Sequence, residues 1–220
     1  MNTSARKPSA MQRVVSDPVS RRRFLALTGG TTAAGALLAA CGNHDDEGDA
    51  TAATTEDDMA SQFGEGDLGI VNYALTLEYL EAAFYADVAK SGLFKGDDLA
   101  LIERIGRAEQ EHVDALTAAA KQLGGQPAAE PKAEFPLDDA KSVLELAATV
   151  ENLGAAAYLG QAAAISDPEI LAAALSIHSV EGRHAAVLNT LVGMPATPDG
   201  AFAQGADMQT VLEEVQPFIT

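Results

Sequence analysis

The chain has 220 residues, of which 47% are hydrophobic and 21% charged, and its formal net charge is −18 at pH 7. This length allows one domain with appended segments, and the apolar content is sufficient for a buried core. The acidic excess argues against nucleic acid and anionic lipid headgroups as partners. Because Cys41 is the only cysteine, an internal disulfide and a cysteine-based metal site are excluded.

The first 40 residues have the order of features found in export signals. Ser20 to Leu25 read SRRRFL, which resembles a twin-arginine motif, and the apolar stretch that follows ends in LAAC at residues 38–41. That ending resembles a lipobox, whose cysteine is lipidated and becomes the first residue of the mature protein. A transmembrane anchor is the alternative, but only about 17 residues separate Arg23 from Cys41, and a span usually needs about 20. We therefore expect residues 1–40 to be a cleaved lipoprotein signal.

Such a signal implies export by the twin-arginine route and an extracytoplasmic protein held at the lipid membrane through acylated Cys41. Residues 41–65 are rich in Asp, Glu, Gly, Ala and Thr and contain few large apolar side chains. This composition is typical of disorder, so we expect an acidic tether between the membrane and a folded domain.

Four long segments with apolar residues at every third or fourth position follow, and no β pattern competes with them. Asp67 is a good N-cap for the first segment, and Asp167 with Pro168 combines an N-cap with a proline at the first position of the fourth. We therefore predict an all-α domain at residues 66–195. Its helices are expected at residues 67–91, 97–123, 138–165 and 167–193.

The connections between these helices indicate the topology. Short links join the first helix to the second and the third to the fourth, which makes each pair an antiparallel hairpin. Residues 124–137, between the hairpins, can reach about 46–50 Å when extended, which is enough to cross a bundle. The tail at residues 196–220 contains an amphipathic stretch, 208–218, that we expect to pack on the outside as a short helix.

A pattern of chemically active residues occurs twice, once in each hairpin. A glutamate is followed by a tyrosine seven residues later and by a Glu-x-x-His pair about 30 residues later. The first copy comprises Glu78, Tyr85, Glu109 and His112, and the second comprises Glu151, Tyr158, Glu181 and His184. The metal-ligand candidates lie near the middle of their predicted helices, so we expect their side chains at one level of the bundle.

Four carboxylates that face a core repel one another and cost several kcal/mol each unless cations neutralise them. Two divalent cations would balance the four charges, and one imidazole for each metal would complete the coordination. Carboxylate oxygens with imidazole suit iron or manganese. We therefore predict a dimetal site bridged by Glu109 and Glu181. Tyr85 and Tyr158 are expected either to orient a carboxylate by hydrogen bonding or to be core aromatics.

Two residues break the symmetry of the repeat. Glu81 follows Glu78 by one turn, where the second copy has Gly154, so it is either an extra ligand or the ligand of a shifted register. The matched tyrosine spacing favours Glu78. His178 lies one turn before the second Glu-x-x-His pair, where the first copy has Gly106. It is a candidate third nitrogen ligand or proton relay, although a local hydrogen bond is the commoner role.

In order and spacing, four stretches resemble the ferritin-like superfamily and, within it, bacterial secreted ferritin-like domain proteins. They are NYALTLEYLEAAFY (72–85), AEQEHVDAL (108–116), VENLGAAAYLGQA (150–162) and VEGRHAAVL (180–188). The resemblance implies a four-helix bundle with a di-iron or dimanganese centre. Its implied ligands are Glu78, Glu109, His112, Glu151, Glu181 and His184.

The resemblance leaves the activity open, because relatives include ferroxidases, peroxidases, manganese catalases and oxygenases. We expect a redox enzyme that uses two iron ions, or two manganese ions, to act on O2, H2O2 or Fe2+ at the cell envelope. The alternative is a non-catalytic, lipid-anchored bundle that binds metal or protects against stress.

Overall fold

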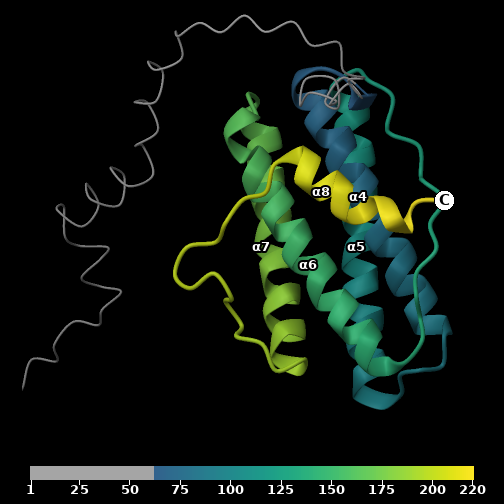
Figure 1. The fold of residues 1–220 in the computed structure, drawn as a ribbon. Helices are drawn as coiled ribbons and strands as arrows, with labels where there is room; N and C mark the ends of the chain where they lie inside the picture. The colour runs from purple at the N-terminus through teal and green to yellow at the C-terminus, as the bar shows by residue number, and fades with distance from the viewer. Residues whose placement is uncertain (1–61) are drawn as a thin grey trace, which may run out of the picture. The chain divides into compact units, whose positions relative to one another are not determined.

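The computed structural model describes residues 62–220, which form four long helices and a short C-terminal one (Figure 1). The helices are α4 (Gly66–Lys90), α5 (Gly96–Gln122), α6 (Ala140–Gln161), α7 (Pro168–Leu191) and α8 (Met208–Val215), with single 3-10 turns η1 (Ala162–Ala164) and η2 (Gln216–Phe218). The expected signal, Cys41 and the tether up to residue 61 lie outside the described residues. None of the described helices combines the length and hydrophobicity needed to cross a membrane.

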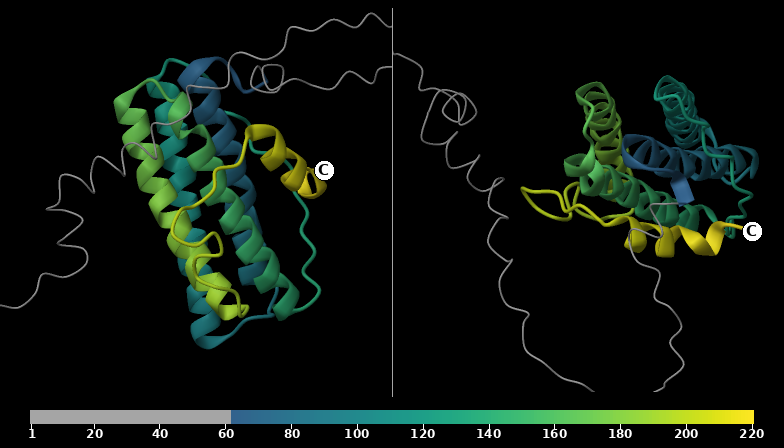
Figure 2. Two further views of the ribbon diagram at one scale, coloured as in Figure 1. Left: turned by 60° about the vertical axis from the view of Figure 1, so that its left-hand side comes forward. Right: turned by 90° about the horizontal axis from the view of Figure 1, so that it is seen from above.

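The long helices pair in chain order. α4 and α5 form one antiparallel hairpin, α6 and α7 form the other, and residues 123–139 run along the side of the bundle between them (Figure 1). α8 packs on the outer side of α4 and α6, as the view from above shows (Figure 2). The predicted all-α bundle of two hairpins joined by a long crossover is therefore confirmed.

Two separate apolar layers fill the bundle. One layer includes Leu75 of α4 and Leu116 of α5, and the other includes Phe84 of α4 and Ile105 of α5. Each fully buried side chain of this size stabilises the fold by about 1.5–3 kcal/mol. On every long helix, the predicted metal-ligand glutamate lies between the residues that enter the two layers. The packing therefore encloses the middle of the bundle between two water-excluding layers.

The crossover is attached to α4 by one buried amide. Asn72, only 6% exposed, donates hydrogen bonds to the carbonyls of Phe63 and Gln126 at 2.9 and 3.2 Å. Its side-chain oxygen accepts the backbone N–H of Ala128 at 2.9 Å. Because these bonds satisfy loop backbone groups, they fix where the crossover leaves the end of α5.

The prediction that Asp67 caps α4 is wrong. The N-cap is Glu65, which makes no side-chain capping bond, and Asp67 lies in the first turn of the helix. The Asp67 carboxylate instead accepts the backbone N–H groups of Ser166 and Asp167 at 2.8 and 2.7 Å. These donors lie immediately before α7, so Asp67 joins the starts of two helices that are far apart in sequence.

The third helix is shorter than predicted. α6 begins at Ala140, because the Asp139 side chain accepts the N–H groups of Lys141 and Ser142 and forms a capping box. The helix ends at Gln161 and continues only as η1, where residue 165 was expected. The start of α7 agrees with the prediction, with Asp167 as a bonded N-cap and proline in the first turn. The tail stretch 208–218 divides into α8 and η2.

Candidate metal centre

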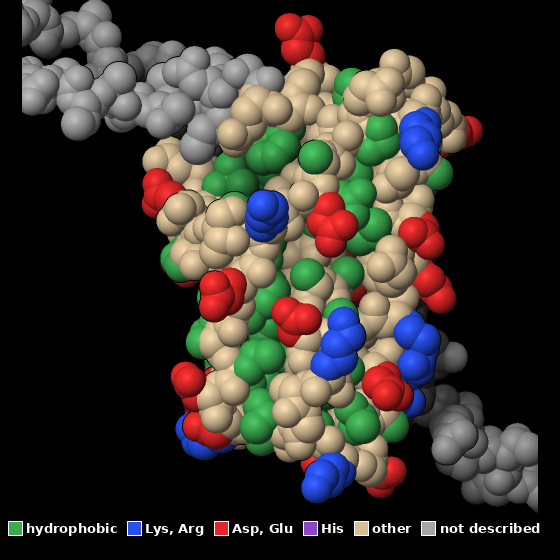
Figure 3. Space-filling view, turned by 90° about the vertical axis from the view of Figure 1, so that its right-hand side faces the viewer, with side chains coloured by type: hydrophobic (Ala, Val, Ile, Leu, Met, Phe, Trp, Pro, Cys, Tyr) green, Lys and Arg blue, Asp and Glu red, His purple; other side chains and the backbone are tan. Residues whose placement is uncertain are grey.

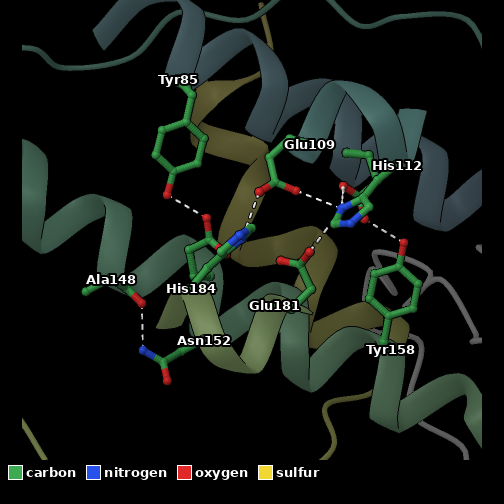
Figure 4. Close-up of polar contacts among 10 residues, drawn as sticks. Tyr85, Glu109, His112, Ala148, Asn152, Tyr158, Glu181 and His184 are labelled. Carbon is green, nitrogen blue, oxygen red and sulfur yellow. Dashed lines mark hydrogen bonds and ion pairs between the residues drawn. The ribbon is translucent and has the colours of Figure 1, made fainter. Parts of the chain in front are cut away.

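Four glutamates, one from each long helix, meet at the centre of the bundle. Their side chains are fully buried, with an exposed fraction of 0% in every case; they are Glu78, Glu109, Glu151 and Glu181. Figure 4 shows Glu109 and Glu181 between the imidazoles of His112 and His184. The structure thus brings together the six side chains that the repeat singles out.

Each imidazole faces carboxylates through its Nδ1 atom. Nδ1 of His112 lies 2.9 Å from Glu109 Oε2 and 3.2 Å from both Glu78 Oε2 and Glu181 Oε1. Nδ1 of His184 lies 2.9 Å from Glu109 Oε1 and 3.3 Å from Glu151 Oε2. The i, i+3 spacing on α5 places Glu109 and His112 on one helix face, as the sequence predicts.

The two tyrosines support the cluster crosswise. Tyr85 of α4 donates a hydrogen bond of 2.5 Å to Glu151 of α6, and Tyr158 of α6 donates one of 2.5 Å to Glu78 of α4. All four groups are buried. Each tyrosine therefore orients the carboxylate of the opposite hairpin, which selects the hydrogen-bonding role over that of a plain core aromatic.

The six side chains form two overlapping groups. In each group the ligand atoms all lie within 4.8 Å of one another. One group comprises Glu78, Glu109, His112 and Glu181, and the other comprises Glu109, Glu151, Glu181 and His184. Glu109 and Glu181 belong to both, which is the arrangement that a bridged metal pair requires.

Burial controls the protonation of most of these carboxylates. It raises the pKa of Glu78 to about 7 and raises the pKa values of Glu151 and Glu181 above the ordinary range. Glu109 differs: burial would raise its pKa, but its close contacts with His112 and His184 outweigh burial and lower it. A metal-free cluster thus contains carboxyl groups that resist ionisation.

The imidazoles respond to the same carboxylates. Burial would lower the pKa of His112, but its close contacts with Glu109, Glu181 and Glu78 raise it to about 12. The contacts of His184 with Glu109 and Glu151 likewise outweigh burial and raise its pKa to about 9. Protons therefore neutralise this cluster when no cation does.

Several polar atoms of the cluster make no hydrogen bond and are therefore free to bind cations. Within residues 62–220, six buried side-chain polar atoms have no hydrogen-bond partner, and five of them belong to this cluster. Four of the five form only the imidazole–carboxylate contacts of 2.9–3.3 Å given above, and Glu181 Oε2 has no such contact. Because buried polar atoms are nearly always satisfied, such a concentration indicates a group that binds here. Carboxylate oxygens with one imidazole in each group fit iron or manganese better than a structural zinc site.

Glu81 lies beside the cluster but outside both groups. It is 4% exposed, and within residues 62–220 it makes no hydrogen bond or ion pair. Burial, followed by the charges of Glu181 and Glu78, raises its pKa well above the usual range. A Cβ atom at Gly154 would lie 2.8 Å from Glu81 Oε1, so the glycine provides the space for this side chain.

His178 is only half-buried, and its Nδ1 lies 3.0 Å from the backbone carbonyl of Ala155. It belongs to neither ligand group. The local hydrogen bond therefore agrees with the commoner of the roles considered for it. Gly106 is the equivalent position in the first hairpin. A Cβ atom there would lie 2.8 Å from Tyr85 Cβ, so close packing against Tyr85 favours glycine at this position.

One polar pair near the cluster has no counterpart in the sequence prediction. Asn189, which is fully buried, exchanges two hydrogen bonds with Asn152, at 2.8 and 3.2 Å, and so connects α7 to α6. Asn152 also donates to the carbonyl of Ala148 (Figure 4). No sequence spacing predicts a pair of neutral amides. The position of Asn152 directly after the ligand candidate Glu151 was the one indication in the sequence that it lies near the cluster.

The comparisons with known proteins agree with this geometry. The family model described as the ferritin-like domain matches residues 66–194, which contain all four long helices and the whole cluster. No curated protein matches the chain. With more than half of its length matched by that family model, the chain belongs to the ferritin-like domain family.

Proposed function

We propose that the protein binds two iron ions, or two manganese ions, and is an oxidoreductase that acts on O2, H2O2 or Fe2+ at the cell envelope. The observation that supports this function best is the pair of ligand groups that share Glu109 and Glu181. These two glutamates would serve both metals. Glu78 and His112 would complete one metal site, and Glu151 and His184 the other.

The residues of and around the cluster would balance the charge of the metals, orient their ligands and exclude water. A bound metal pair would supply two-electron chemistry toward O2 or H2O2. Two divalent cations would balance the four buried glutamates and displace the protons that otherwise neutralise them. Tyr85 and Tyr158 hold Glu151 and Glu78 in fixed orientations, while the two apolar layers limit access of water to the reacting groups.

The location at the envelope is supported by the sequence of the first 41 residues. The SRRRFL and LAAC stretches suit twin-arginine export and acylation of Cys41. We expect the wild-type chain to incorporate labelled palmitate and to lose residues 1–40, and the Cys41→Ser chain to do neither. A wild-type chain that stays membrane-bound, unlabelled and with its leader uncleaved would point to the transmembrane alternative.

A second candidate function is a bundle that binds metal without turnover. The complete burial of all four glutamates favours it, since a closed site exchanges ligands slowly. Both functions require metal, and they differ in reactivity. A protein with two bound metals whose absorption spectrum stays unchanged after O2 and after H2O2 would support the second function.

The decisive experiment is metal analysis of the purified protein, with absorption spectra recorded before and after each oxidant. We expect about two metals for each chain, as the two ligand groups imply, and a spectral change with at least one oxidant. Glu109→Gln removes one shared charge at nearly constant shape and should abolish stoichiometric binding. Glu111→Gln, an exposed position on the same helix, is the matched control and should behave like wild type. A well-folded wild-type protein that takes up no metal would refute the proposed function.

A further inference from the structure

Of the two positions that break the symmetry of the hairpins, the one at Glu81 lies beside the metal-ligand cluster. Glu81 follows Glu78 by three residues on α4, whereas the equivalent residue after Glu151 on α6 is Gly154. A Cβ atom at Gly154 would lie 2.8 Å from Glu81 Oε1 and 3.3 Å from Glu181 Oε2. Because Gly154 has no side chain, the Glu81 carboxyl fits against α6 close to the shared carboxylate of Glu181.

A small cavity borders Glu81 and Gly154 and lies between α4 and α6, on the side away from α5 and α7. Its volume is about 20 Å³, enough for a water molecule or a diatomic gas. Leu77 and Leu80 line it from α4, and Val150 and Leu153 from α6. Among the described residues, Glu81 is the one charged residue in its lining.

The last residues of the chain cover the outer side of this cavity. Val211 and Val215 of α8, together with Phe218 of η2, line it from outside. The crossover holds this cover in place. Glu134 N–H donates to the Phe218 carbonyl at 2.9 Å, and the Phe135 and Phe218 rings lie 5.6 Å apart.

We propose that this cavity is the route by which a small uncharged oxidant reaches the shared carboxylates, with Glu81 at its inner end and α8 as its outer cover. This inference rests on the proposed function. Apolar walls admit O2 or H2O2 more readily than a metal cation, because a cation would lose its hydration there without a compensating ligand. The imidazoles lie on the opposite, α5 and α7 side and are 11% and 15% exposed, so metal uptake does not depend on the cavity.

Glu81 suits the inner end of such a route. The other glutamates of the centre each contact an imidazole or a tyrosine, whereas Glu81 has neither contact. Its removal therefore leaves the hydrogen bonds of the two ligand groups unchanged. Its carboxyl lies between the cavity and the shared carboxylate of Glu181.

The test changes the volume of the cavity at Val211, which is fully buried and belongs to α8, a helix that carries no metal-ligand candidate. Val211→Ile adds one methylene to the cavity and Val211→Ala enlarges it. Val143→Ile and Val143→Ala are matched controls, because Val143 is equally buried but lies in the far apolar layer. Four properties are measured on the full chain: unfolding by urea, metal content, xenon occupancy of metal-free crystals under pressure, and the rate at which O2 oxidises the reduced, metal-loaded protein.

We expect xenon to occupy the cavity of the wild-type protein and of both Val143 variants, and to be absent from Val211→Ile. The bimolecular rate constant with O2 should fall about tenfold in Val211→Ile and rise in Val211→Ala, with metal content unchanged. Equal rates in all five proteins, with xenon lost from Val211→Ile, would overturn the route while the proposed function stands. A wild-type protein without metal, or without reaction, would overturn the function and the route together.

Discussion

Glu109 contacts both imidazoles of the cluster, whereas each of the other three glutamates contacts one. Its two oxygens lie 2.9 Å from the imidazoles of His112 and His184, and its pKa is lowered while those of Glu78, Glu151 and Glu181 are raised. In the metal-free centre at neutral pH, Glu109 is therefore ionised and lies between two protonated imidazoles. Metal binding must release protons from the other groups, so metal affinity should increase with pH.

The crosswise tyrosines should matter for metal affinity more than for folding. Tyr158→Phe removes the hydrogen bond to Glu78, so that the carboxylate loses its fixed orientation. We expect the apparent metal affinity to fall roughly tenfold to a hundredfold in a chelator competition assay. Tyr79→Phe is the control, since Tyr79 is half-buried on α4 next to Glu78 and makes no side-chain hydrogen bond within residues 62–220. Equal affinities for the two variants would contradict the orienting role.

The stability of the metal-free protein should decrease as pH rises. Glu78 has a folded pKa of about 7 against an ordinary value of 4.5, so the folded state keeps a proton that the unfolded chain has lost between these values. At about 1.4 kcal/mol for each pKa unit, Glu78 alone lowers the free energy of unfolding by roughly 3 kcal/mol as pH rises from 4.5 to about 7. His184 acts in the same direction, because its contribution is complete below pH 6.5 and is lost as pH rises through about 9. Urea unfolding between about pH 5 and about pH 8 measures this trend, and a rising free energy of unfolding would refute it.

At the scale of helices, α6 is the element on which the C-terminal segment packs. A Cβ atom at Gly160 would lie 1.9 Å from the carbonyl oxygen of Ala206, and Ala206 N–H donates to the Ala156 carbonyl at 3.0 Å. The backbone of residues 205–206 therefore touches α6 directly. This contact positions α8 over the seam between α4 and α6.

Gly160→Ala should displace that segment. The added methyl group would meet backbone, which cannot rotate away, so we expect a loss of about 1–3 kcal/mol in urea unfolding and faster amide exchange in α8. Gly182→Ala is the matched control, because a Cβ there meets nothing within 4 Å. It should be neutral or stabilising by up to about 1 kcal/mol, since alanine is the better helix former. Similar effects of both changes would mean that the segment does not depend on its contact with Gly160.

At the scale of the whole molecule, the centre lies where all four long helices meet, so metal binding and folding should be coupled. A metal that binds only the folded state adds about 2.7 kcal/mol when its free concentration is a hundred times its Kd. We expect this stabilisation for the wild-type protein in thermal or urea unfolding, and its absence in Glu109→Gln. It should increase with pH, opposite to the trend of the metal-free protein, because the metal binds the deprotonated ligands. Metal that leaves the unfolding midpoint unchanged would contradict this coupling.

The surface contributes little to this coupling. On the face drawn in Figure 3, acidic, basic and hydrophobic side chains are interspersed. Exposed ion pairs such as Lys141 with Glu145 contribute little to stability. We therefore expect the effect of metal on stability to come from the buried carboxylates of the centre.

The sequence by itself determined the four helices, their hairpin pairing and the set of six residues that converge. Helical spacing explains this success, because an i, i+3 pair such as Glu109 and His112 shares a face in any α-helix, and short links force neighbouring helices to pack antiparallel. Helix ends were predicted less well where a capping residue had more than one possible role, as with Asp67. Capping depends on local backbone geometry, which composition does not specify.

Only the tertiary structure decided which side chains meet across hairpins. The donation from Tyr85 to Glu151, the bonds from Asp67 to the start of α7, and the opening that Gly154 leaves for Glu81 all join segments distant in sequence. Such contacts depend on how far one helix is rotated and shifted along its neighbour. Packing of the whole core sets those two quantities, and no local spacing in the chain encodes them.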